Sequence, residues 1–141
     1  MQLCRDTITL YNGRYEPRLD RDIWRLTLIE GVSWYHMSGA AQRKTQLSPQ
    51  DTLFLRIPID ARTKGKIYVD PLEYKRLADP TDTYTLNEGD IVIHGIADVD
   101  ILSPAEAHRL YPGAITILSV HDNRRAPNAP HFLVLGGQKW G

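Results

Sequence analysis

Hydrophobic and polar positions alternate over short segments of the chain, and proline or glycine residues separate these segments. A period of two places alternate side chains on opposite faces of an extended strand, so the pattern predicts β-strands. The Glu30-Gly31 pair interrupts the longest of these segments and predicts a bulge there. We expect strands over residues 7–11, 23–34, 53–59, 67–69, 91–96, 115–120 and 132–135.

Turn and helix signals lie between the predicted strands. Asn12-Gly13 readily adopts the positive φ angles of a tight turn and predicts a hairpin after the first strand. Asp70-Pro71 and Ser103-Pro104 each have a glutamate three residues after the capping position, which is typical of a helix start. Both helices are expected to be short, because Pro80 and Pro112 end them.

The predicted elements favour a mainly β fold. Neither helix is long enough to cross over a parallel sheet, so we expect the strands to pair antiparallel. We therefore predict one domain over residues 1–141, a small antiparallel β-barrel or sandwich of about seven strands with two short helices. A long flexible loop is expected over residues 36–46 and a C-terminal tail over residues 136–141.

Composition and charge narrow the classes of partner. The 141 residues contain 17 Lys plus Arg and 17 Asp plus Glu, a formal net charge of +0, which argues against a partner held mainly by long-range electrostatics. The only cysteine, Cys4, excludes an internal disulfide framework and a cysteine-rich zinc site, and it fits a reducing compartment. The sequence has no apolar run of the roughly 20 residues that a membrane span needs and no signal-peptide pattern, so we expect synthesis in the cytosol and no membrane partner.

Short motifs for metal binding or catalysis are absent from the sequence. The pairs Asp20/Asp22 and Asp98/Asp100 lack the glycine and the distant glutamate of a calcium loop. There is no Gly-x-Ser-x-Gly elbow and no Walker loop. We therefore expect no metal, no cofactor and no catalytic residue, unless the fold brings separated groups together. The histidines, none of which shows a short metal-ligand spacing, are His36, His94, His108, His121 and His131.

Aromatic and basic residues leave one alternative class open. Seven tyrosines and three tryptophans could stack on single-stranded nucleic acid, with Arg43, Lys44, Arg124 and Arg125 on the phosphates. On alternating strands, however, aromatic side chains more often belong to a core or an interface. A small barrel that binds nucleic acid is therefore the alternative hypothesis.

The order of motifs in this chain resembles a known family. The C-terminal half contains TLNEGDIVIHG at 85–95, DILSPAE at 100–106, TILSVHDNR at 116–124 and HFLVLGGQ at 131–138. In the N-terminal half, TLYN at 9–12, Trp34, Ile57-Pro58, Tyr68-Val69 and Glu73-Tyr74 are also similar. Together these segments resemble small phage and prophage proteins of the head and head-to-tail module of long-tailed phages of Gram-positive bacteria.

This resemblance implies a structural protein of the virion, found in the host cytoplasm during assembly. The nearest roles are a minor capsid protein, a head-completion protein or a stopper-type connector, a small β-barrel with a long inserted loop that forms a ring beneath the portal. Its partners would be portal, adaptor or tail proteins and further copies in the ring, with DNA only a transient cargo in the channel. The resemblance leaves open the oligomeric state of the protein before assembly, and a monomer is one of the possibilities. The candidate assembly contacts are Arg43, Lys44, Asp122, Arg124, Arg125 and Trp140.

Overall fold

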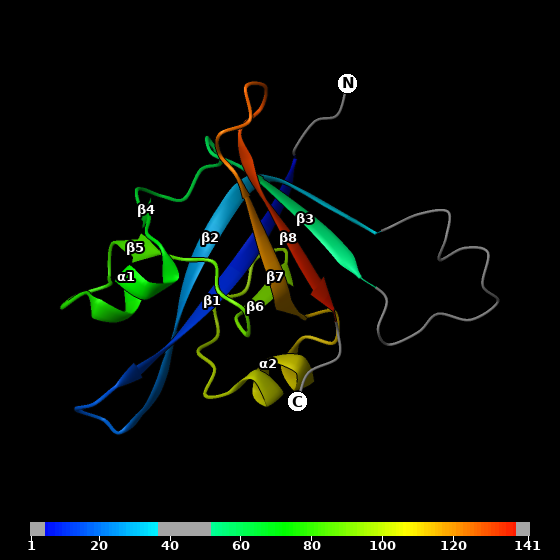
Figure 1. Ribbon diagram of the computed structural model, residues 1–141. Coiled ribbons are helices and arrows are strands. Elements are labelled where there is room, and N and C mark those ends of the chain that lie inside the picture. The colour runs from blue at the N-terminus through cyan, green and yellow to red at the C-terminus, as the bar shows by residue number, and fades with distance from the viewer. Residues whose placement is uncertain (1–4, 37–51, 138–141) are drawn as a thin grey trace.

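Residues 5–36 and 52–137 are described by a computed structural model. In these residues the chain forms eight strands and two helices (Figure 1). The helices are α1 (Pro71–Arg76) and α2 (Pro104–Leu110). The strands are β1 (Asp6–Glu16), β2 (Arg21–His36), β3 (Leu53–Pro58), β4 (Ile67–Tyr68), β5 (Thr83–Tyr84), β6 (Ile91–His94), β7 (Ile115–Asn123) and β8 (His131–Gly137).

Six of the strands close into a barrel in the order β1-β2-β3-β8-β7-β6, with β6 paired back onto β1. Every pair within the barrel is antiparallel, which confirms the predicted mainly β, antiparallel fold. The short strands β4 and β5 form a separate parallel pair outside the barrel. β4 lies within the strand predicted over residues 67–69, and β5 is the strand that was not predicted, because its two residues carry too little alternation to be recognised.

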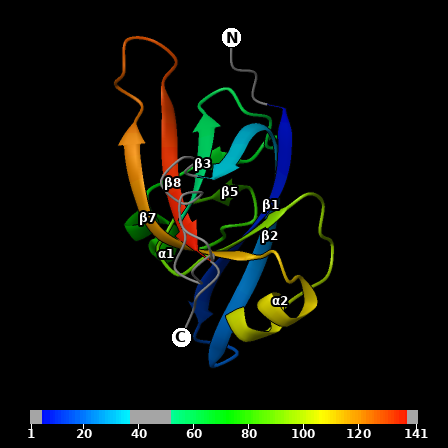
Figure 2. The same ribbon diagram turned by 90° about the vertical axis from the view of Figure 1, so that its right-hand side faces the viewer.

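The main core fills the barrel and includes Ile8, Leu10, Ile29, Leu55 and Val134, all buried. β5 and the connection to β6 also contribute to this core, with Tyr84 and Leu86 respectively. β4, β5 and α1 therefore cover one side of the barrel, whereas α2 lies against another part of it (Figures 1 and 2).

A second core lies between the outer face of the barrel and the segment that contains α2. Tyr11 of β1 and Ile91 of β6 meet Ala97, Ile101 and Ala107 there, all of them buried. β1 is consequently buried on both faces from Ile8 to Asn12, which a strand facing solvent on one side would not be.

The predicted turn at Asn12-Gly13 is wrong. β1 continues to Glu16, and the turn of the hairpin occupies residues 17–20. Gly13 is the partner of Trp24 on β2, and a Cβ atom at Gly13 would lie 2.8 Å from the Trp24 ring. Asn12 is buried, and its side chain donates a hydrogen bond to Asp90, the residue directly before β6. Asn12 and Gly13 therefore lie in the middle of a strand, where their contacts with neighbouring segments matter, and they do not form a turn.

The predicted bulge and both predicted helix starts are confirmed. Asp6 pairs with Val32 and Thr7 with Glu30, so Gly31, with φ 90°, is the extra residue on β2. α1 and α2 each begin with the predicted proline, and in α2 the Ser103 side chain accepts a hydrogen bond from the Glu106 backbone.

Two predicted boundaries shift in the structure. β2 includes His36, so the predicted loop over residues 36–46 does not begin there, and its remaining residues lie outside the described part of the chain. β8 includes the residues at 136 and 137, because the ladder with β7 continues to the pair of Thr116 with Gly137. Only residues 138–141 follow this strand, and they also lie outside the described residues.

Candidate interaction surfaces

The loop between β7 and β8 is held to the β4–α1 segment through Arg124. The Arg124 guanidinium donates to both carboxylate oxygens of Asp122, at 2.9 and 2.7 Å, and lies 3.9 Å from Asp70. The same guanidinium packs over the rings of Tyr68 and Phe132, at 5.2 and 5.1 Å from their centroids. We call this group of five residues the Arg124 clamp. It gives the loop one orientation relative to the barrel.

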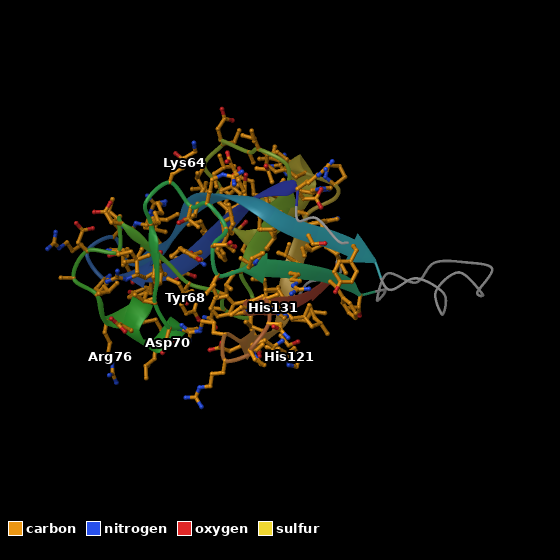
Figure 3. All side chains as sticks on the ribbon, turned by 90° about the horizontal axis from the view of Figure 1, so that it is seen from above. Lys64, Tyr68, Asp70, Arg76, His121 and His131 are labelled. Atoms are coloured by element: carbon orange, nitrogen blue, oxygen red, sulfur yellow. The ribbon has the colours of Figure 1, made fainter. Side chains whose placement is uncertain are left out.

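The clamp lies where segments distant in sequence meet. Seen from above, Tyr68 and Asp70 lie beside the hairpin that carries His121 and His131 (Figure 3). The hydrogen bond from Arg124 lowers the pKa of Asp122, so this carboxyl stays ionised and keeps its partner over the whole physiological range. The ion pair is solvent-exposed, and its main effect is to orient the loop rather than to stabilise the fold.

Of the predicted assembly contacts, the structure brings Asp122 and Arg124 together within one chain. Arg125 follows them, is exposed, and has no ion pair among the described residues. Arg43, Lys44 and Trp140 lie outside the described part of the chain. Arg125 is therefore the described candidate whose charge is available to a partner.

A buried polar network joins β1 to the turn before β6. The Asn12 amide donates to Asp90 Oδ2 at 2.7 Å and to the Thr85 carbonyl at 2.8 Å, and it accepts from the Thr85 N–H at 3.2 Å. The Gly13 N–H donates to Asp90 Oδ1 at 3.1 Å. Burial raises the pKa of Asp90 to about 7, against the opposing effect of the hydrogen bonds from Asn12 and Gly13. The network closes the barrel between two segments that lie far apart in sequence.

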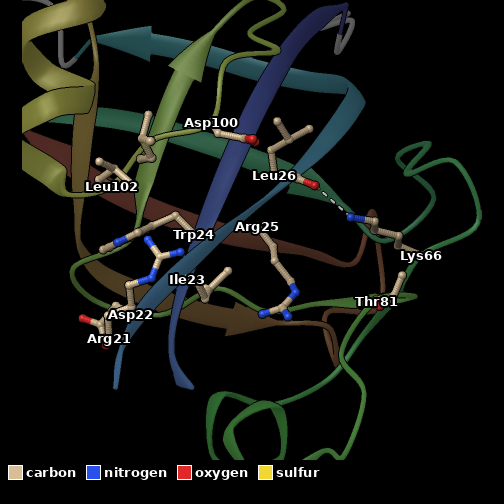
Figure 4. Close-up of a pocket in the computed structure, with 11 residues that line it drawn as sticks. Arg21, Asp22, Ile23, Trp24, Arg25, Leu26, Lys66, Thr81, Asp100 and Leu102 are labelled. Atoms are coloured by element: carbon tan, nitrogen blue, oxygen red, sulfur yellow. Dashed lines mark hydrogen bonds between the residues drawn. The ribbon is translucent and has the colours of Figure 1, made fainter. Parts of the chain in front are cut away.

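An open groove of about 440 Å³ runs along β2 on the outside of the barrel. Its floor includes Trp24 and Leu26, and Figure 4 shows Asp100 and Leu102 on one side and Lys66 on the other. The Lys66 ammonium donates to the Leu26 carbonyl at 2.8 Å and also to a threonine hydroxyl. Burial lowers the pKa of this lysine. Lys66 thus covers part of an edge of β2 that no neighbouring strand pairs with.

The segment between β6 and α2 forms one side of this groove and is fixed by side chains of the barrel. Thr9 Oγ1 donates to the Gly95 carbonyl and accepts from the Ala97 N–H, both at 2.9 Å. The Tyr11 hydroxyl donates to the Val99 carbonyl at 2.6 Å, and burial raises the Tyr11 pKa to about 12, so the hydroxyl remains a donor. The segment is therefore held in place, with Ala97 and Ile101 buried, although Ile96, Val99 and Leu102 are exposed.

The comparisons with known proteins assign the chain to a family. A model of a family of unknown function, DUF6751, matches residues 3–137. The chain belongs to this family. Neither the curated proteins nor the solved structures contain a match. All the surfaces described above lie within the part of the chain that matches DUF6751.

Two further observations concern the described residues of this DUF6751 protein. In them, no three His, Cys, Asp or Glu side chains lie close enough together to hold a metal ion. None of the described helices is long and apolar enough to cross a membrane.

Sequence reasoning missed Asp90 and Lys66. Asp90 resembles an ordinary turn residue, although it directly precedes three consecutive apolar residues, a signal that it enters a buried strand. Lys66 lies in a basic turn, and only the fold brings its ammonium to the edge of β2.

Proposed function

We propose that this protein is a structural protein of a phage virion, a subunit of the head-to-tail connector of the stopper or head-completion type. It would act through contacts with neighbouring copies in a ring and with portal, adaptor or tail proteins. DNA would pass through the channel of the ring without being held. The protein would be made in the host cytoplasm and retained in the virion.

The observation that carries this proposal is the oriented hairpin of β7 and β8. The hairpin extends beyond the rest of the barrel (Figures 1 and 2), and the Arg124 clamp holds its loop in one position. A loop that is already ordered loses little conformational entropy when it binds, which is an advantage for a contact between subunits. Arg125 is then the exposed cation that a neighbouring surface would meet.

The closed barrel also supports a connector subunit. His36 of β2 is paired with Leu53 of β3, so the connection between these strands leaves and re-enters the barrel at neighbouring positions. The resemblance to stopper-type connectors implies a long insertion in the sequence, and residues 37–51, which lie outside the described residues, join these two neighbouring strands. The nucleic-acid alternative has less support, because the guanidinium of Arg124 is engaged within the chain.

The gene neighbourhood gives the first test of this proposal. Portal, capsid and tail genes on either side of this gene are the expected result. A neighbourhood of metabolic genes without any virion gene would contradict the proposal.

A binding experiment with the portal complex encoded beside the gene tests the hairpin itself. We expect the wild-type chain to co-sediment with the portal complex, and Arg125→Glu to weaken that binding by about tenfold. The matched control is Arg18→Glu, which makes the same charge change in the exposed turn of the β1–β2 hairpin. Equal binding by the two variants would show that the β7–β8 loop is not the contact, and a salt-sensitive shift of single-stranded DNA would favour the nucleic-acid alternative.

A further inference from the structure

Two segments of opposite charge border the groove along β2. Residues 96–102, which we call the acidic wall, contain Asp98 and Asp100 and no Lys, Arg or His. Residues 62–67, the basic wall, contain Arg62, Lys64 and Lys66 and no Asp or Glu. The acidic wall lines the groove with Asp100, Ile101 and Leu102, and the basic wall lines it with Lys66.

The acidic wall presents apolar side chains on a fixed backbone. The side chains of Ile96 and Leu102 are 74% and 66% exposed, and Val99 is exposed as well. Asp98 and Asp100 have no ion pair among the described residues. Exposed apolar side chains are common on protein surfaces, but three of them on one anchored segment, beside two unpaired carboxylates, form a surface suited to a partner.

The basic wall has the same construction with the opposite charge. Backbone hydrogen bonds of 2.8 and 2.9 Å between Glu30 and Arg62 attach it to β2, and Ile67 is 67% exposed. Lys64 is exposed and has no ion pair in the described part of the chain, whereas Arg62 is paired with Glu30 at 3.1 Å. The described hydrogen bonds of the Lys66 ammonium go to uncharged oxygens.

We propose that a second copy of this chain covers the groove, with the acidic wall of each copy on the basic wall of the other. Because both walls contribute residues to one groove, a twofold rotation that brings the acidic wall of each copy onto the basic wall of the other satisfies both contacts at once and gives a closed pair. The apolar side chains of each wall would meet across the interface, and the half-buried Trp24 and Leu26 on the floor would be removed from water.

Complementary charge is what selects a second copy over an unrelated partner. An acidic wall needs a basic, partly apolar surface, and the basic wall of the same protein is such a surface, presented at the matching side of the same groove. The pair does not depend on the proposed connector role, since it concerns the isolated chain in solution.

Charge reversal tests this pair. One variant carries Asp98→Lys and Asp100→Lys, and the other carries Arg62→Glu and Lys64→Glu. In either variant alone, walls of like charge face each other, and we expect the dissociation constant of the pair to rise at least about a hundredfold. In an equimolar mixture of the two variants, both contacts join opposite charges again, so we expect a mixed dimer, which also shows that both variants are folded.

Sedimentation equilibrium at low and high salt is the measurement. The wild type is expected to be a dimer that weakens with added salt, since the contacts between rim charges are screened. The matched control, Glu73→Lys with Glu88→Lys, changes the net charge by the same amount at exposed positions outside the groove and should remain dimeric. A monomeric wild type, a dimer that survives both reversals, or a mixture that stays monomeric would each overturn the proposed pair, and a larger oligomer would overturn its twofold geometry.

Discussion

Removal of the Asn12 side chain should destabilise the protein strongly, because this side chain is the centre of the buried polar network between β1 and the turn before β6. Asn12 is 1% exposed and is bonded to Asp90 and to both backbone groups of Thr85. Asn12→Ala leaves three buried polar atoms without their partner: Asp90 Oδ2, the Thr85 carbonyl oxygen and the Thr85 N–H. A buried polar group that loses its partner costs about 1–3 kcal/mol, and relaxation recovers part of the sum. We therefore expect a loss of about 3–5 kcal/mol in the free energy of unfolding.

The size of this loss should depend on pH. The hydrogen bond from Asn12 favours the charged form of Asp90, whose pKa is about 7 in the folded protein. Near pH 5 the Asp90 carboxyl is largely neutral, whereas near pH 8 it is largely charged and relies on the Asn12 amide. Asn12→Ala should consequently be more destabilising at pH 8 than at pH 5.

Urea unfolding at the two pH values, followed by circular dichroism, measures both effects. Asn128→Ala is the matched control, because Asn128 is exposed in the β7–β8 loop, and its loss should change the free energy of unfolding by less than about 0.5 kcal/mol. A loss below about 1 kcal/mol for Asn12→Ala, or an equal loss at both pH values, would refute the proposed energetics of the network.

Three further predictions concern Asp90, Arg124 and Gly13. Burial raises the pKa of Asp90 from 3.8 to about 7, so the contribution of this carboxyl to stability is fully present below about pH 4. This contribution, ~4 kcal/mol at most, is lost as the pH rises to about 7. Asp90→Asn should therefore flatten this part of a curve of unfolding free energy against pH. Arg124→Ala should cost only about 1 kcal/mol in thermal unfolding, since the ion pair of Arg124 with Asp122 is solvent-exposed, and a much larger loss would give the clamp a structural role. Gly13→Ala places a Cβ 2.8 Å from a tryptophan ring and should cost about 1–3 kcal/mol by urea unfolding, whereas Gly113→Ala, with open space around the new Cβ, should not.

Local signals in the sequence were sufficient for most of the secondary structure. Alternation, or a short run of apolar residues as in β6, locates the six barrel strands, because every strand places apolar side chains in a core. The start of α2 at Ser103-Pro104 and the bulge at Glu30-Gly31 depend only on residues close in sequence. Both features could therefore be predicted without knowing the fold. β4 lies within the strand predicted over residues 67–69, whereas β5 was missed, because a two-residue strand depends on its neighbours for its position.

The candidate surfaces were less accessible to sequence reasoning. Asp122 and Arg124 lie two residues apart in the sequence, so their ion pair is a short-range interaction that needs no distant segment. Tyr68 and Asp70 of the clamp belong to β4 and the segment after it, far from Arg124 in sequence, so only the fold shows that Arg124 contacts them. The two walls of the groove are likewise separate loops in sequence and neighbours only in space.

The sequence by itself determined the strands, the helix starts, the bulge and the antiparallel class, because these follow from alternation and from contacts between residues close in the chain. Only the tertiary structure decided what Asn12 and Gly13 do. The same dipeptide that favours a turn in isolation lies inside β1, where Asn12 contacts the buried Asp90 carboxylate from the turn before β6 and Gly13 packs against the Trp24 ring of β2. Contacts between distant segments can outweigh a local turn preference, because burial and hydrogen bonding of the whole side chain involve more free energy than one pair of backbone angles.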